Sequence, residues 1–113
     1  MKLITEELRK ALPTLYSQEN EKDPMVVCKF FLPMTPWTWY ATEGEPVLDE
    51  SGKEVDFRFF GLVDGHDREL GYFLLGELEE VRGPMGLPIE RDLHFKPQTL
   101  EEIAPEMFSE VRD

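Results

Sequence analysis

Residues 57–75, FRFFGLVDGHDRELGYFLL, carry the strongest structural signal in this chain. Two apolar runs, residues 57–63 and 69–75, are rich in the aromatic and β-branched side chains that favour strands. Between them lies DGHD, residues 64–67, which has the residue types of a tight turn. This stretch therefore predicts two antiparallel strands joined by a short turn.

A second hairpin is predicted just before it. Residues 25–32 read MVVCKFFL and residues 37–42 read WTWYAT, with PMTP between them as the turn. Four successive strands, with short links apart from one long loop, predict a four-stranded antiparallel meander. Residues 93–95 are a candidate edge strand. The fold class is therefore α+β, in a single domain that spans residues 1–113.

Short helices are predicted at both ends of the chain and in the middle. Thr5 can cap an N-terminal helix, and Thr99 with Glu102 matches a capping box. Residues 77–82 form a third candidate, because Gly83 suits the left-handed conformation that follows a helix and a proline comes next.

The charge of the chain is strongly acidic and unevenly distributed. Its 113 residues hold 24 acidic and 12 basic side chains, a net charge of −12. Residues 43–56 carry six acids and predict a long, mobile acidic loop, whereas residues 99–113 carry five, with a flexible tail from residue 105. Such a balance argues against direct nucleic-acid binding, which needs a basic footprint.

Compartment and redox state follow from what the sequence contains. Its longest nearly apolar run, residues 70–76, has seven residues, whereas a membrane span needs about 20. The single cysteine, Cys28, excludes a disulfide framework and is predicted to be a core thiol in an apolar strand. We therefore expect a cytoplasmic protein without a membrane-spanning segment. His94 is predicted to be a satisfied strand histidine.

Both faces of the predicted sheet carry large apolar side chains. An antiparallel sheet that is covered on one side normally presents a polar second face. Helices must therefore cover one face, and the Pro/Gly loop, the C-terminal segment or a second protein must cover part of the other. Because the chain holds 13 aromatic residues, which are hard to bury in so short a chain, a protein partner or a homodimer is one of the possible covers.

Two sets of residues are candidates for contacting that partner. One set is aromatic and lies on one predicted strand, and the other is charged and flanks the loop of residues 83–88. The candidates are Trp37, Trp39, Tyr40, Arg82, Glu90 and Arg91. Each set has a structural alternative: the aromatic residues in the core, and the charged residues as an ion pair that pins the loop.

The turn before the fourth strand holds candidates for metal binding or acid–base chemistry. Its carboxylates and imidazole belong to Asp64, His66, Asp67 and Glu69. They could hold a divalent cation or supply a general base, but their spacing matches neither a calcium loop nor a zinc hydrolase helix. A charged hairpin turn is the alternative. No catalytic residue and no cofactor is predicted.

Four segments carry a family resemblance. They are LPTLY at residues 12–16, WTWY at 37–40, ELGYF at 69–73 and RGPMGLPIERD at 82–92. In these segments the chain resembles domain-of-unknown-function family 2958, over roughly residues 3–100. The resemblance implies a small bacterial protein of conjugative plasmids and integrated mobile elements, and it implies no catalytic residues.

Three functions remain open. The first, which the two apolar faces favour, is a non-enzymatic accessory protein that binds another protein. The second is an acidic DNA mimic that inhibits a nuclease or restriction enzyme, which requires both acidic segments to share one face. The third is a small metal-assisted hydrolase that uses the turn at residues 64–69.

Overall fold

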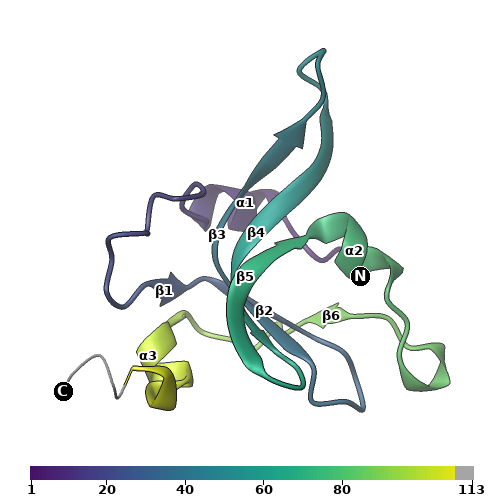
Figure 1. Cartoon of the computed structure of the whole chain (residues 1–113). Helices are drawn as coiled ribbons and strands as arrows, with labels where there is room; N and C mark the ends of the chain where they lie inside the picture. The colour runs from purple at the N-terminus through teal and green to yellow at the C-terminus, as the bar shows by residue number, and fades with distance from the viewer. Residues whose placement is uncertain (109–113) are drawn as a thin grey trace.

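The computed structural model describes residues 1–108 and contains two antiparallel sheets. Its main sheet has five strands in the order β5-β4-β3-β2-β6 (Figure 1). These strands are β2 (Cys28–Phe31), β3 (Thr38–Leu48), β4 (Glu54–Asp64), β5 (Arg68–Leu74) and β6 (Glu90–Arg91). A small second sheet pairs β1 (Met25–Val26) with β7 (Gln98–Thr99).

Short helices connect and flank the strands. The α-helices are α1 (Glu6–Ala11), α2 (Leu75–Glu80) and α3 (Leu100–Ile103), and two 3-10 turns are η1 (Pro84–Gly86) and η2 (Pro105–Met107). The predicted α+β class and antiparallel meander are confirmed, but the main sheet has five strands and not four. Within residues 1–108, no helix is long and apolar enough to cross a membrane.

The fifth strand does not lie where the sequence predicted an edge. Strand β6 pairs with β2 through Phe31 and Glu90, whereas Leu93 and His94 form a turn. The Asp92 carboxylate accepts a hydrogen bond from the backbone N–H of His94 at 2.9 Å, which stabilises that turn. The prediction of an edge strand at residues 93–95 is therefore wrong, and the strand begins three residues earlier, at Glu90.

Residues 43–56 are not a loop, and this prediction is also wrong. Strands β3 and β4 pair from Thr38↔Asp64 out to Leu48↔Glu54, so only residues 49–53 form the connecting turn. The Asp49 carboxylate accepts hydrogen bonds from the backbone N–H groups of Ser51 and Lys53, which fixes the turn. The result is a long two-stranded arm that projects from the body of the molecule (Figure 1).

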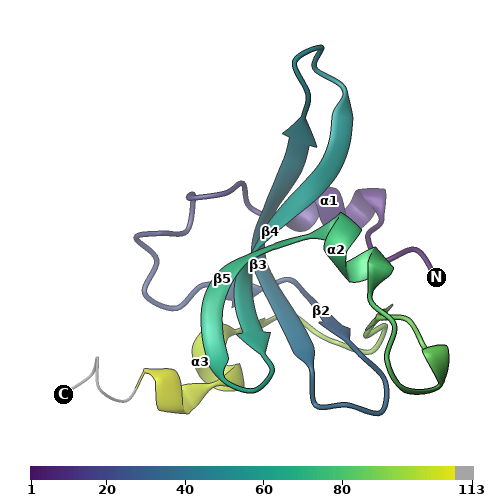
Figure 2. The same ribbon diagram turned by 45° about the vertical axis from the view of Figure 1, so that its right-hand side comes forward.

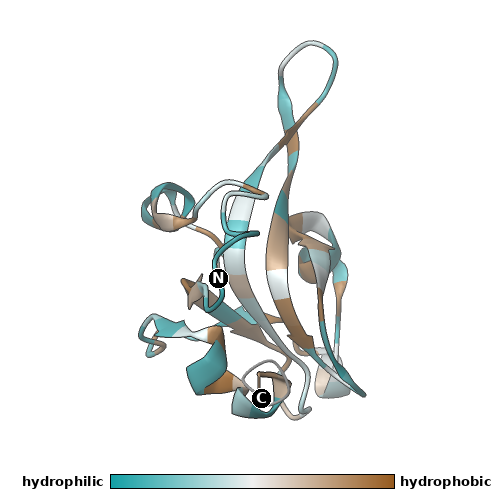
Figure 3. Cartoon of the chain, turned by 60° about the vertical axis from the view of Figure 1, so that its left-hand side comes forward, coloured by the Kyte–Doolittle hydropathy of each residue, from teal (hydrophilic) through white to brown (hydrophobic). Residues whose placement is uncertain are grey.

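One face of the main sheet, which we call the closed face, is fully covered. Its aromatic side chains pack under the N-terminal segment, α1 and α2. The buried residues of this core include Phe30, Trp39, Phe57, Phe59, Phe73, Leu3, Ile4, Leu12 and Leu78. Figure 3 shows the hydrophobic colour concentrated in the body of the sheet, whereas the tip of the arm is mainly teal and white.

The opposite face, which we call the open face, is covered only in part. A second, smaller core joins Val26 and Leu62 to Leu100 and Ala104 of the C-terminal segment. The C-terminal segment is thus one of the covers that the sequence predicted. The predicted flexible tail is partly ordered, since Pro105–Met107 form η2, and residues 109–113 lie outside the described residues.

Helix termini follow the predicted capping chemistry at both ends of the chain. The Thr5 hydroxyl accepts a hydrogen bond from the N–H of Leu8 at 3.2 Å, and Thr99 and Glu102 form the expected capping box. Both devices satisfy backbone donors that the first helical turn leaves without partners.

The middle helix and the loop after it differ from the prediction. Helix α2 begins at Leu75, two residues earlier than expected, because the Glu77 carboxylate accepts from the backbone N–H of Leu74. Gly83 is extended with a φ of −101°, and the left-handed residues are Met85 and Gly86 instead. Gly83 is required for space, since a Cβ there would lie 2.9 Å from the side chain of Leu32.

Candidate interaction site on the open face

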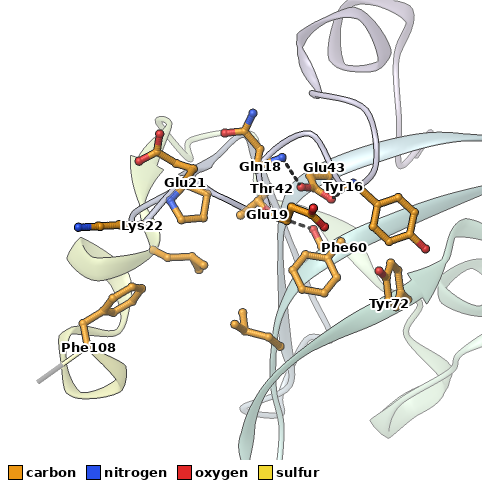
Figure 4. A pocket seen from close by; sticks show the side chains of 13 residues that line it. Tyr16, Gln18, Glu19, Glu21, Lys22, Thr42, Glu43, Phe60, Tyr72 and Phe108 are labelled. Atoms are coloured by element: carbon orange, nitrogen blue, oxygen red, sulfur yellow. Dashed lines mark hydrogen bonds between the residues drawn. The ribbon is translucent and has the colours of Figure 1, made fainter. Parts of the chain in front are cut away.

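A groove of about 390 Å³ lies on the open face, between the connector of residues 16–24, strands β4 and β5, and the C-terminal segment. Figure 4 shows Phe60 and Tyr72 rising from the sheet on one side, with Lys22 and Phe108 on the other. An adjoining cavity of about 260 Å³ shares Lys22, Leu70 and Phe108 and continues the same depression. The groove is therefore continuous along the uncovered part of the sheet.

A buried carboxylate holds the connector against the sheet. Glu43 is only 4% exposed, and its two oxygens accept hydrogen bonds from the backbone N–H groups of Tyr16 and Gln18, both at 2.9 Å. Next to it, Glu45 accepts from the N–H of Leu15 at 2.8 Å. A register shift between Ala41 and Glu43 marks a bulge, which re-aims side chains on the bulged strand.

Two exposed tyrosines form part of the rim. The rings of Tyr16 and Tyr72 lie 6.2 Å apart, and Tyr72 also packs edge-on against Phe60 at 5.0 Å. A hydrogen bond with Tyr16 raises the pKa of Tyr72, and burial and the negative charges of Glu43 and Glu19 raise it further. The Tyr72 phenol therefore stays neutral at physiological pH.

The backbone at Tyr16 is in an unusual conformation. Its φ is +70°, a region that residues with a Cβ rarely adopt. Such strain costs of the order of 1–3 kcal/mol and persists only where the surroundings impose it. Here Glu43 binds the Tyr16 N–H, so the buried carboxylate supplies part of that constraint.

Charge at the groove is mainly negative. Glu19, Glu21 and Glu43 line it, and Lys22 is a basic residue among them. Its floor and rim are apolar, through Phe60, Leu70, Tyr72, Leu100 and Phe108. Such a surface is complementary to a segment that carries apolar side chains together with basic ones.

The predicted aromatic candidates are divided between the two faces. Trp39 is buried and Trp37 half-buried on the closed side, where their rings stack at 5.9 Å. Tyr40 is half-buried on the open face, beside Phe95 and under the ammonium of Lys29. The three residues do not form one exposed surface, so a joint role in partner binding stays an untested prediction.

The charged candidates near the Pro/Gly loop bind backbone carbonyls. Arg82 donates to the carbonyl oxygens of Glu79 and Val81, and Arg91 to those of Lys2 and Leu3, all at 2.8 Å. Within residues 1–108, no ion pair joins Arg82 or Arg91 to Glu90, although Glu90 is half-buried beside them. The predicted ion pair is thus absent from the described residues. The two guanidinium groups hold the chain by donating hydrogen bonds to backbone carbonyl oxygens instead.

The ionisable turn of residues 64–69 is arranged as a structural hairpin. Arg68 donates to the Asp64 carboxylate at 3.0 Å and also contacts the Glu106 carboxylate of η2. The exposed His66 ring packs edge-on against Trp37 at 5.5 Å, and Asp67 and Glu69 are also exposed. In the described part of the chain, no three His, Cys, Asp or Glu side chains come together as a metal site.

The prediction for Cys28 is confirmed, and the prediction for His94 is wrong. Cys28 is a free, buried thiol whose burial raises its pKa to about 12, which confirms the predicted core thiol. His94 is exposed in a turn, so the prediction of a strand histidine is wrong.

The tip of the first acidic segment, residues 49–53, lies at the opposite end of the molecule from the described part of the second, residues 99–108, whereas the buried Glu43 lines the groove together with Leu100 and Phe108. The tip of the β3–β4 arm stands at the top of Figure 1, and α3 lies at the bottom. The part of the C-terminal acidic segment that is described, residues 99–108, therefore does not share a surface with residues 49–53. This arrangement does not favour a DNA mimic, which needs its charges on one face.

A comparison of the sequence with protein-family models finds a match to a family described as proteins of unknown function (DUF2958), over residues 3–104. The chain belongs to the DUF2958 family. The DUF2958 match includes every strand of the main sheet and the groove residues Tyr16, Phe60, Leu70, Tyr72 and Leu100. No curated protein and no solved structure matches the chain.

Proposed function

We propose that this protein is a non-enzymatic accessory protein of mobile elements that binds another protein through the open-face groove. One observation carries the proposal: Tyr16, Leu70 and Tyr72 are 63%, 49% and 50% exposed around a continuous groove. Large apolar side chains that cluster at the surface around a depression are typical of binding sites. The mobile-element setting comes from the family resemblance.

The chemistry of the groove defines the partner that would fit. Apolar side chains of the partner would pack on Phe60 and Tyr72, while its basic side chains would face Glu19 and Glu21. Glu43 is already engaged by two backbone N–H groups, so it shapes the groove and leaves the outer carboxylates for recognition. The expected ligand is a peptide segment with interspersed apolar and basic residues.

An apolar dye and two designed peptides test this proposal. The protein should increase the fluorescence of the dye, and should bind a leucine–lysine peptide but not the matching leucine–glutamate peptide. Tyr16→Ser combined with Tyr72→Ser should abolish both signals, because it removes the exposed rim.

A matched control separates the groove from exposed apolar surface in general. Leu48 and Val55 are 58% and 59% exposed on the β3–β4 arm, away from the groove. Leu48→Ser with Val55→Ser should leave dye and peptide binding unchanged. Equal losses in both double variants, or binding of both peptides alike, would contradict the proposal.

A further inference from the structure

We infer that two copies of this chain pair antiparallel through the outer edge of β5, centred on Gly71, to form a continuous sheet across a homodimer. This inference rests on the backbone of β5 and does not depend on what the groove binds. Exposed edge strands are common sites of strand addition.

The two edges of the main sheet differ sharply. Edge strand β6 has two residues, and Arg91 binds it to the carbonyl oxygens of Lys2 and Leu3. Edge strand β5 has seven residues and pairs only with β4 among the described residues. Figure 2 shows β5 curving along the outside of the sheet. A long edge without proline or an intervening segment is available for pairing.

Hydrogen bonds show which backbone groups point outward. The N–H of Leu74 donates to the Glu77 carboxylate at 3.0 Å, so it points away from β4. Alternation along the strand then directs the N–H and C=O groups of Leu70 and Tyr72 outward as well. On the other side of β4, the Phe60 carbonyl accepts from Thr42, which agrees with a non-hydrogen-bonded Phe60–Tyr72 pair.

The sequence of β5 makes this edge self-complementary. A two-fold axis through Gly71 places Leu70 opposite Tyr72 of the second copy, and both residues direct their backbone groups toward the shared edge. On the open face, this pairing would form two rows of side chains across the dimer. Each row would run from Leu62 through Leu70 of one copy to Tyr72 and Phe60 of the second copy. The rows join apolar side chains, which stabilise cross-strand pairs.

The ends of the strand limit the pairing to its centre. The Leu74 N–H is already bound by the Glu77 carboxylate, and Arg68 is bound by Asp64 and Glu106, so the intermolecular hydrogen bonds join Leu70 and Tyr72 of each copy. At the centre, a Cβ built on Gly71 meets no atom within 4 Å, so a side chain can be introduced there without a clash.

The oligomeric state provides the first test. Analytical ultracentrifugation of the full chain over a dilution series should show a dimer that dissociates to the 13.2 kDa monomer. Leu70→Pro should halve the mass at high concentration, because it removes an outward N–H while leaving the ladder to β4 intact. Leu70→Ala, which keeps the N–H, is the matched control and should retain most of the dimer.

A disulfide test does not depend on how well the proline variant folds. Opposed residues in a non-hydrogen-bonded pair have Cα atoms about 4.5 Å apart, within the range of a disulfide. Oxidised Gly71→Cys should therefore run as a covalent dimer, whereas Ser51→Cys at the arm tip should not. Cys28 is buried and does not compete.

Three results would overturn the inference. They are a monomer at every concentration, a dimer that Leu70→Pro leaves intact, and equal cross-linking of Gly71→Cys and Ser51→Cys. A monomer that gains a strand from a foreign peptide at β5 would assign the edge to another partner and would also contradict the homodimer.

Discussion

The closed and open faces belong to the same strands, yet one is sealed and the other is not. On the closed face Phe59 of β4 is completely buried, whereas on the open face Leu70 and Tyr72 of the adjacent strand β5 are about half exposed. Their side chains are similarly apolar, so the difference lies in the cover. Helices α1 and α2 with the N-terminal segment cover one face, and α3 with η2 covers only part of the other.

The largest expected effect lies at the centre of the closed face. Phe59→Ala should lower the free energy of unfolding by about 3–5 kcal/mol, because it removes a buried ring that contacts Phe30, Phe57 and Phe73. Urea unfolding followed by circular dichroism would measure this change. A loss below about 1 kcal/mol would mean that the closed face contributes no more to the free energy of unfolding than the open face does.

The next effect concerns the carboxylate that holds the connector on the open face. Glu43→Ala should cost about 2–3 kcal/mol, because it leaves the N–H groups of Tyr16 and Gln18 without their charged acceptor. Hydrogen exchange at these two amides should accelerate. Glu50→Ala, an exposed acidic residue in the arm turn, is the control, and comparable exchange rates in the two variants would contradict the assignment.

The pH dependence of stability offers a test specific to the closed face. Cys28 has a pKa of about 12 in the folded protein, against 9.0 as its ordinary value. The buried neutral thiol therefore makes its full contribution to the free energy of unfolding below pH 9. This contribution declines as the pH rises from 9 toward 12, because the unfolded chain loses the proton first. At pH 10 about 1 kcal/mol should be lost relative to pH 7, and Cys28→Ala should reduce this dependence. An unchanged pH profile in that variant would exclude Cys28 as the cause.

Loss of the cap on α3 should loosen the cover of the open face. Thr99→Ala should cost about 1 kcal/mol and increase apolar-dye binding, because α3 packs Leu100 against the sheet. Thr5→Ala removes the matching cap of α1 and should cost a similar amount. Thr5→Ala is the control. It should increase the dye signal less than Thr99→Ala does, because α1 lies over the closed face. Equal dye signals would remove the distinction between the faces.

The smallest effect is expected on the exposed rim itself. Leu70→Ala should change the free energy of unfolding by less than about 0.5 kcal/mol, since Leu70 is half exposed. Differential scanning calorimetry would show an almost unchanged melting temperature under dilute, monomeric conditions. A large loss would place Leu70 in the core and contradict its role as accessible surface.

Local signals in the sequence predicted local features. The capping residues Thr5 and Thr99, and the apolar strand runs at residues 57–63 and 69–75, are confirmed because each depends on neighbours in the chain. The alternation of Leu70 and Tyr72 already placed both on one face. Their exposure could not be predicted, because it depends on how far α3 reaches.

Features that depend on distant contacts were missed. Gly44 and Pro46 disfavour a strand, yet both lie in β3, because the Phe57 ring packs where a Cβ of Gly44 would lie and Glu43 anchors the connector. Likewise, β6 exists through its pairing with β2 and has no strong strand pattern of its own. The connector that carries Tyr16 has no periodic pattern, so no local signal revealed the groove.

The β3–β4 arm has a practical consequence for work on this protein. The outer end of its two strands is fixed by Arg9 of α1, whose guanidinium binds both oxygens of Glu54 at 2.7 Å. The turn beyond that bond contacts neither sheet face, so an affinity handle or fluorophore inserted between Ser51 and Gly52 should leave the folding core undisturbed. Such an insertion would present the protein to a surface or detector with its groove and β5 facing solution.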